Sequence, residues 1–240
     1  MIKRILLGLF IYVAAISSRA EDGSRLWLRY DTVNTVPQIE CGFDSPVVRV
    51  AAGELSSFWK GGKVSLQLMA DSKHYSLGND GYTITTHNGV TCIGSLSEKG
   101  LLYAAYHLLR LQECGIDCSR LDISEKPVYD IRILNHWDNP DGTIERGYAG
   151  RSLWKWDELP SVISPRYVSY ARANASIGIN GTVLNNVNAS PEVLSTDNLE
   201  KVKALADIFR PYGIRVYLSV NFASPIKLGG LPTAAPLGEN

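Results

Sequence analysis

Residues 133–154, ILNHWDNPDGTIERGYAGRSLW, place a dense polar patch directly after an apolar run. Aromatic rings, amides, carboxylates and guanidiniums follow one another within this stretch. Its candidate ligand-contacting residues are Trp137, Asp138, Asn139, Glu145, Arg146 and Arg151. A sugar ring packs its apolar face on tryptophan, while its hydroxyls need groups that donate and accept hydrogen bonds. The residue types therefore favour a carbohydrate ligand, and the arginines suit a sugar that carries a carboxylate or a phosphate.

Several of these residues also have structural interpretations. His136 and the tryptophan after it could belong to the core, and Asp138 or Asp141 could cap a turn, because DNPDG has turn chemistry. Glu145 could form an internal salt bridge with Arg151. Glu145 and Arg146 are neighbours, so in an extended chain their side chains would point in opposite directions. The sequence alone leaves these alternatives open.

Two further apolar segments end in polar residues in the same way. The segment 180–189, NGTVLNNVNA, ends around Asn185, Asn186 and Val187, and the segment 214–225 carries Asn221 past its apolar part. Helix-like segments separate these strands. Alternating strands and helices predict parallel strands, whose carboxyl ends meet at one edge and carry ligand sites. The recurring polar strand ends therefore predict one shared site.

The sequence divides into two regions with different patterns. Residues 22–127 are typical of a small α+β domain, and residues 128–240 of a β-loop-α-β-α-β segment. In the first region an Asn88-Gly89 pair predicts a hairpin turn, Ser97 can begin a helix and Gly115 can end it. The expected strands are 26–30, 63–71, 81–95 as a hairpin, 128–137, 180–189 and 214–225, and the expected helices follow Ser97 and lie in 164–179 and 190–213.

The N-terminus has the pattern of a signal peptide. Lys3 and Arg4 precede the apolar run Ile5 to Ile16, and small residues lead to a cleavage site near Ala20. We therefore expect a signal peptide over residues 1–20, export, and no membrane contact after cleavage. Export permits disulfides, but four cysteines allow three pairings and the sequence does not choose among them.

Composition excludes several other functions. Lysines and arginines number 24, as do aspartates and glutamates, so the net charge of zero gives no sign of a nucleic-acid partner. The sequence contains no GxxxxGK[ST], GxGxxG, HExxH or GxSxG motif, which disfavours nucleotide, zinc-protease and α/β-hydrolase functions.

Three motifs in order identify a family resemblance. LNHWDNPDGTIERGYAGRSLW, INGTVLNNVNA and YGIRVYLSVNFASPIKLGGLPTA resemble the glycoside hydrolase family 67 α-glucuronidases, and the likeness covers residues 25–236. It implies an α+β domain followed by a (β/α)₈ barrel, of which this chain would hold the first three strands. It further implies inverting removal of glucuronic acid or its 4-O-methyl ether from xylo-oligosaccharides, with no metal or organic cofactor. Periplasmic location and a homodimeric full-length form are expectations of the same resemblance.

The resemblance also assigns individual residues. Trp137 corresponds to a tryptophan of the sugar pocket, and Val187 to an apolar residue beside the 4-O-methyl group. The family's acid, its base and the basic residues that bind the uronate carboxylate would all fall beyond Asn240. We therefore assign no catalytic residue to this chain and expect it to be inactive alone. The alternative is a non-catalytic carbohydrate-binding protein.

Overall fold

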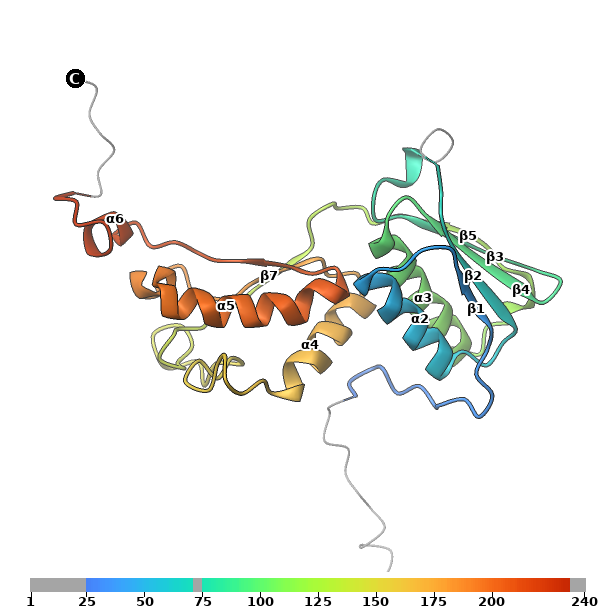
Figure 1. Ribbon diagram of the computed structural model, residues 1–240, viewed down its shortest axis with the longest axis horizontal. Helices are drawn as coiled ribbons and strands as arrows, with labels where there is room; N and C mark the ends of the chain where they lie inside the picture. The colour runs from blue at the N-terminus through green and yellow to red at the C-terminus, as the bar shows by residue number, and fades with distance from the viewer. Residues whose placement is uncertain (1–24, 71–74, 234–240) are drawn as a thin grey trace, which may run out of the picture.

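The computed structural model describes residues 25–70 and 75–233, which form two sheets with helices between and beside them (Figure 1). A five-stranded sheet lies at one end and a parallel three-stranded sheet toward the other. The proposed signal peptide falls outside the described residues. No helix among the described residues has the length and apolar character that crossing a membrane requires. All four cysteines are unpaired.

The five-stranded sheet has the strand order β1-β2-β4-β3-β5. Its strands are β1 (Ile39–Cys41), β2 (Lys63–Leu68), β3 (Tyr82–His87), β4 (Val90–Ser95) and β5 (Asp122–Glu125). Helices α2 (Pro46–Phe58) and α3 (Glu98–Glu113) cover one face (Figure 1). Val64, Ile84 and Ile93 are fully buried there. This combination confirms the mixed α and β pattern expected from the sequence.

The hairpin and the helix after it form where their local signals predict. β3 and β4 pair antiparallel, with His87 opposite Val90. The turn residues Asn88 and Gly89 have φ of 49° and 76°, the left-handed values that asparagine and glycine tolerate best. Ser97 caps α3 by accepting a hydrogen bond from the Gly100 backbone N–H at 3.2 Å. Local chemistry therefore determines both elements.

The prediction of a strand at 26–30 is wrong. This segment pairs with no strand among the described residues, although Leu28 and Tyr30 are buried and Arg29 between them is exposed. The alternating burial arises because Leu28 and Tyr30 pack against the core, and not because the segment pairs in a sheet. β1, β5 and α2 were not predicted from the sequence. For α2 a signal was available, because Ser45 followed by Pro46 is typical of a helix start, and Ser45 does cap this helix.

The second sheet is parallel with the order β6-β7-β8, as its alternating sequence predicts. Its strands are β6 (Ile133–Asn135), β7 (Gly181–Val183) and β8 (Arg215–Tyr217). Helices α4 (Pro165–Ser176) and α5 (Thr196–Phe209) pack on one face. Short 3₁₀ helices lie elsewhere in the described chain, at Tyr75–Leu77, Cys118–Arg120, Pro191–Leu194 and Arg210–Tyr212. The strands are shorter than predicted, and α6 (Ser224–Lys227) occupies residues assigned to the third strand.

The two faces of the parallel sheet differ. Leu184, Val216 and Leu218 belong to the core formed with α4 and α5. On the opposite face the side chains of Ile133 and Tyr217 both lie over Gly181, where a Cβ would sit 2.7 Å and 2.9 Å from them. Glycine is therefore required in the central strand for these two larger side chains to meet.

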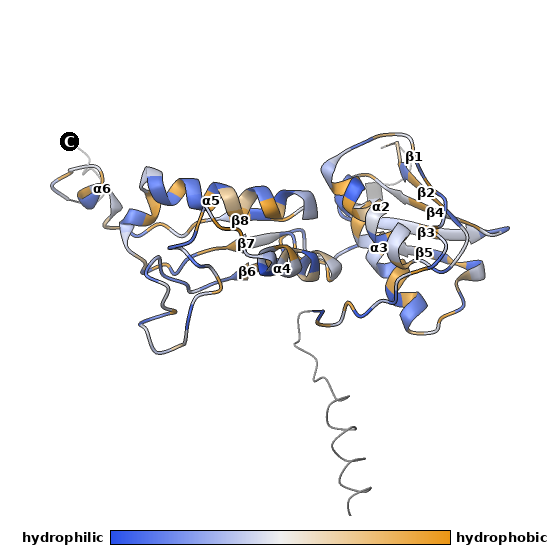
Figure 2. Ribbon diagram, turned by 60° about the horizontal axis from the view of Figure 1, so that its bottom comes forward, coloured by the Kyte–Doolittle hydropathy of each residue, from blue (hydrophilic) through white to orange (hydrophobic). Residues whose placement is uncertain are grey.

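A common core and two buried ionic contacts join the two halves. Figure 2 places α2 and α3 between the five-stranded sheet and the elements around α4. Arg172 of α4 donates to both carboxylate oxygens of Glu54 of α2, one of them at 2.7 Å. Asp80 accepts from Arg132 at 2.7 Å and pairs with Lys99 at 2.8 Å. The parallel sheet is thereby fixed against the five-stranded half.

Candidate functional site at the strand ends

The carboxyl ends of β6, β7 and β8 meet, as the sequence predicts. The His136 backbone N–H donates to the Val183 carbonyl at 3.0 Å, and that of Asn186 donates to the Asp138 carbonyl at 2.8 Å. The Ser219 backbone N–H donates to Asn185 Oδ1 at 2.9 Å. Three segments far apart in sequence therefore form one edge.

The asparagines of this edge hold the loops in place. Asn185 is buried and donates through Nδ2 to the Ser219 carbonyl at 2.9 Å, while Asn186 Oδ1 accepts from the Asn188 N–H at 2.9 Å. Asn221 Oδ1 accepts from the Ala223 N–H at 2.8 Å. The side-chain amides of these three asparagines therefore already form hydrogen bonds with backbone atoms of the loops. Direct sugar contact stays a prediction for all three asparagines.

Asp138 is one of the most enclosed of the predicted site residues, with 2% of its surface exposed. Its Oδ2 accepts hydrogen bonds from the Ser152 hydroxyl and from the Leu153 backbone N–H, the latter at 3.0 Å. The carboxylate therefore ties the end of the long loop to its start. Its predicted contact with a sugar is not tested, but the geometry gives Asp138 a structural task.

His136 packs in an aromatic cluster beneath the edge, as the core alternative expected. Its Nε2 lies 2.8 Å from the Tyr170 hydroxyl, and its ring meets Trp154 edge to face at 5.1 Å between centroids. Burial lowers the pKa of His136, although the Asp138 carboxylate opposes this effect. His136 is accordingly a neutral group that supports the strand end.

The loop after β6 is built on two polar turns. Asp141 accepts from the Thr143 hydroxyl at 2.7 Å and from its backbone N–H at 2.9 Å, and these bonds lower the pKa of Asp141. The turn interpretation of Asp141 is therefore confirmed. Asn139 Nδ2 donates to Thr143 Oγ1 at 2.9 Å and to the Glu145 carbonyl at 2.8 Å. Both residues shape the backbone that carries Glu145.

Glu145 has the most unusual environment of the site. Its φ is 57°, a left-handed value that is uncommon for glutamate. Its side chain is 13% exposed, and Oε2 is buried without a hydrogen-bond partner among the described residues. The opposite directions expected of Glu145 and Arg146 in an extended chain do not apply, because the backbone turns at Glu145 and brings Arg146 Nε within 3.9 Å of Oε1. The alternative salt bridge to Arg151 does not form.

Apolar surface and a pocket complete the edge. Trp137 is 45% exposed and Val187 is 48% exposed, so neither is a core residue. A cavity of about 470 Å³ lies over the edge. It is lined by Asn139, Pro140, Asp141, Thr143, Glu145, Arg146, Gly147, Asn188, Ala189, Ser190 and Glu192. Asn188 and Glu192 were not predicted; the Asn-rich end of the second strand and the acidic first turn after Ser190 were the available signals.

This arrangement suits a hydroxylated ring. The site offers an aromatic face, amides, a guanidinium and a buried carboxylate oxygen that needs a donor. Across residues 25–70 and 75–233, no three histidine, cysteine or acidic side chains gather where they could hold a metal ion. The groups described at this edge can recognise a ligand by hydrogen bonds and ring packing.

Family comparison gives the same class of protein. The model of the glycosyl hydrolase family 67 middle domain matches residues 111–240, more than half of the chain. The class that this match defines is the glycosyl hydrolases. The chain belongs to glycosyl hydrolase family 67.

Curated relatives bear α-glucuronidase names. The chain is 43% identical over 164 residues to "Probable alpha-glucuronidase A" of Aspergillus clavatus, covering 68% of this chain and 19% of that protein. It is 40% identical over 166 residues to "Alpha-glucuronidase A" of Emericella nidulans, covering 67% and 20%. The chain thus spans about a fifth of the length of these relatives.

Solved structures share the fold at low sequence identity. A GH138 enzyme targeting pectin rhamnogalacturonan II superposes with a TM-score of 0.55 at 16% identity, over 75% of this chain and 24% of that one. A GH115 4-O-methyl-α-glucuronidase with specificity for decorated arabinogalactans gives 0.52 at 13% identity, over 82% and 31%. Both likenesses concern the fold alone.

Proposed function

We propose that this chain forms the first part of an α-glucuronidase active site. It binds a terminal glucuronic acid, or its 4-O-methyl ether, on a xylo-oligosaccharide at the carboxyl ends of β6, β7 and β8. In this proposal residues 22–127 are the N-terminal domain and residues 128–240 begin a (β/α)₈ barrel. The sequential parallel order of the three strands supports that assignment, because barrel strands neighbour one another in chain order.

The observation that carries the binding proposal is the environment of Glu145. A buried carboxylate oxygen without a donor is unfavourable, and a sugar hydroxyl at the pocket would supply the missing hydrogen bond. Trp137, half exposed at the same edge, offers the aromatic face on which the ring would pack. Arg146, 82% exposed in its side chain, is available to the uronate carboxylate.

Catalysis is proposed to need groups other than the carboxylates described here. Inversion uses one carboxylic acid and one carboxylate base on opposite sides of the bond that breaks. Asp138 and Asp141 are committed to loop hydrogen bonds. Glu145 and Glu192 line one pocket, but Glu192 is exposed, whereas a general acid is usually buried so that its pKa rises. We therefore propose that the chain alone binds the substrate without cleaving it.

The test of binding titrates the chain with aldotriouronic acid, in which 4-O-methyl-glucuronic acid is attached to xylobiose, by calorimetry. Glu145→Gln and Trp137→Ala should each weaken binding by about tenfold or more, since each removes one principal contact. Glu200→Gln, on the exposed surface of α5, is the matched control and should bind as the parent does. Equal affinity in all four proteins would refute the site.

The test of catalysis measures release of 4-O-methyl-glucuronic acid from the same compound. The chain should release none, while a longer protein that adds barrel strands four to eight should release it. Release by the chain alone, abolished in Glu145→Gln, would instead make Glu145 catalytic. Export through residues 1–20 to the periplasm and assembly of the full-length form as a homodimer belong to the same proposal.

A further inference from the structure

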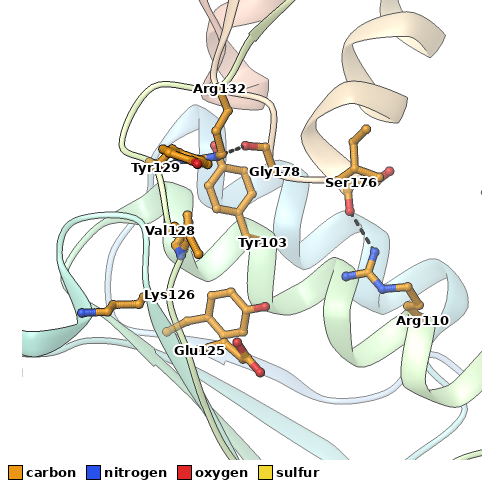
Figure 3. Close-up of a pocket in the computed structure, with 12 residues that line it drawn as sticks. Tyr103, Arg110, Glu125, Lys126, Val128, Tyr129, Arg132, Ser176 and Gly178 are labelled. Carbon is orange, nitrogen blue, oxygen red and sulfur yellow. Dashed lines mark hydrogen bonds between the residues drawn. The ribbon is translucent and has the colours of Figure 1, made fainter.

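A second cavity lies at the junction of the two halves, at the opposite ends of the parallel strands from the candidate site. It has a volume of about 280 Å³. Tyr82, Tyr103 and Arg110 line it from the five-stranded half, and Arg132 and Gly178 line it from the segments that precede β6 and β7 (Figure 3). We call it the junction pocket. None of the predicted site residues lines it.

The hydroxyl of Tyr103 is the first sign that the junction pocket takes a ligand. Tyr103 is 5% exposed, and its Oη is buried near the Arg132 guanidinium, which can only donate, so the hydroxyl hydrogen has no acceptor among the described residues. Burial raises the pKa of Tyr103, and the nearby Arg132 guanidinium only partly opposes that effect, so the phenol stays protonated. A buried O–H without a partner bears a desolvation cost that a ligand oxygen would relieve.

Two charged side chains with spare hydrogen-bonding capacity accompany it. Arg110 donates to the Ser176 carbonyl at 3.1 Å and forms no ion pair within the described part of the chain. The Glu125 carboxylate is exposed, and no side-chain hydrogen bond or ion pair within the described residues involves it. Figure 3 shows Arg110 turned toward Ser176 and Glu125 below the Tyr103 ring in this view. The pocket therefore presents both a strong donor and a strong acceptor.

The remaining wall is apolar and accessible. Val128, Tyr129 and Ile177 are all exposed, with Tyr129 at 73%, and each lines the pocket. By contrast, the Arg132 guanidinium is already occupied by Asp80 and by backbone carbonyls. The charged side chains of the lining without an ion pair are therefore Arg110, Glu125 and the outer Lys126. Because these charges have both signs, the pocket is a poor match for a multiply charged ligand.

We propose that the junction pocket is a second carbohydrate site that binds one pyranose ring. A sugar offers an apolar face to the exposed wall, hydroxyl donors to Glu125, and hydroxyl acceptors to Arg110 and Tyr103. The volume is near the lower limit of ligand pockets, so it suits a single ring and not an extended chain. The halves meet at this pocket, so a bound ring would contact both of them.

The experiment is a titration of the methyl-labelled chain with D-xylose, followed by NMR. The methyl groups of Val128 and Ile177 report the junction pocket, and those of Val187 report the candidate site. Saturable shifts at Val128 and Ile177 should persist in Trp137→Ala, which damages only the candidate site. This separation distinguishes failure of the present proposal from failure of the proposed function. D-Glucuronate as a second probe should bind no more than about tenfold differently, because Arg110 and Glu125 are both present.

Tyr103→Phe is the decisive variant. Because the hydroxyl hydrogen has no acceptor in the described chain, removal of the hydroxyl should leave the melting temperature unchanged or raise it, yet weaken D-xylose binding by about tenfold. The matched control is Tyr148→Phe, which removes an exposed hydroxyl that does not line the junction pocket and should leave the Val128 and Ile177 shifts intact. No saturable shift at Val128 and Ile177 in the parent chain would overturn the proposal, as would unchanged binding by a folded Tyr103→Phe.

Discussion

At the scale of single residues, the candidate site separates groups that hold the loops from groups that remain available to a ligand. Asp138 and Asn185 are buried and form hydrogen bonds that hold the loops, whereas Trp137 presents an exposed ring and Glu145 an unpartnered oxygen. Sequence could predict which residue types gather here. It could not predict this division, because burial depends on loops that close over one another from three strands.

Replacing Asp138 should therefore reduce stability more than a surface change in the same loop. Asp138→Ala leaves the Ser152 hydroxyl and the Leu153 N–H without their acceptor, at a cost of about 1–3 kcal/mol in the free energy of unfolding. Urea denaturation measures the difference. Asp157→Ala, an exposed aspartate of the same segment, should change stability little, and equal effects would refute the structural task of Asp138.

At the scale of elements, prediction succeeded where the signals are local. The Asn88-Gly89 turn, the Ser97 cap and the polar ends of β6 to β8 all act within a few residues of where they stand. It failed at residues 26–30, because alternating burial does not reveal whether a pairing partner exists. Strands of three residues such as β1 and β7 carry too little pattern for their bounds to be predicted.

Gly181 gives a test of the parallel sheet. An alanine Cβ there would lie 2.7 Å from Ile133 Cγ1 and 2.9 Å from Tyr217 Cε2, which forces the strands to shift. Gly181→Ala should destabilise the protein by about 1–3 kcal/mol.

The control for this test makes the same change where there is room. In α2, a Cβ at Gly53 would meet nothing within 4 Å, and alanine favours a helix. Gly53→Ala should therefore stabilise the protein by about 0.5–1 kcal/mol. Thermal melts of both variants give the comparison, and a neutral Gly181→Ala would contradict the packing of the sheet face.

At the scale of the whole molecule, two ionic contacts fix the halves together. Glu54 is buried and Arg172 donates to both of its oxygens, so Glu54→Gln leaves a largely buried guanidinium without its counter-ion. We expect a loss of about 3–5 kcal/mol in unfolding experiments.

The exposed pair Arg49–Asp44 is the control for this prediction. Both side chains are largely exposed, so Asp44→Asn should cost less than about 1 kcal/mol. Similar losses in Glu54→Gln and Asp44→Asn would indicate that the contact between the halves is weaker than its geometry implies.

The lowered pKa of Asp80 leads to a prediction about how the stability of the molecule changes in acid. Burial raises the pKa of Asp80, but hydrogen bonds from Lys99 and Arg132 outweigh it and the net pKa is lowered. Its contribution to stability is therefore complete above the unfolded pKa, near pH 4, and is lost as the pH falls through the lower folded value. Asp80→Asn should flatten the fall in melting temperature below pH 4. An unchanged acid profile would contradict this assignment.

The measurement that tests the central claim most directly is a methyl NMR titration of the chain with aldotriouronic acid. The proposed function predicts saturable shifts at Val187, beside the strand ends, that disappear in Trp137→Ala and in Glu145→Gln while both variants keep the parent's melting behaviour. Shifts that leave Val187 unmoved, or that survive both substitutions, would mean that the polar ends of β6, β7 and β8 do not form the glucuronic acid site.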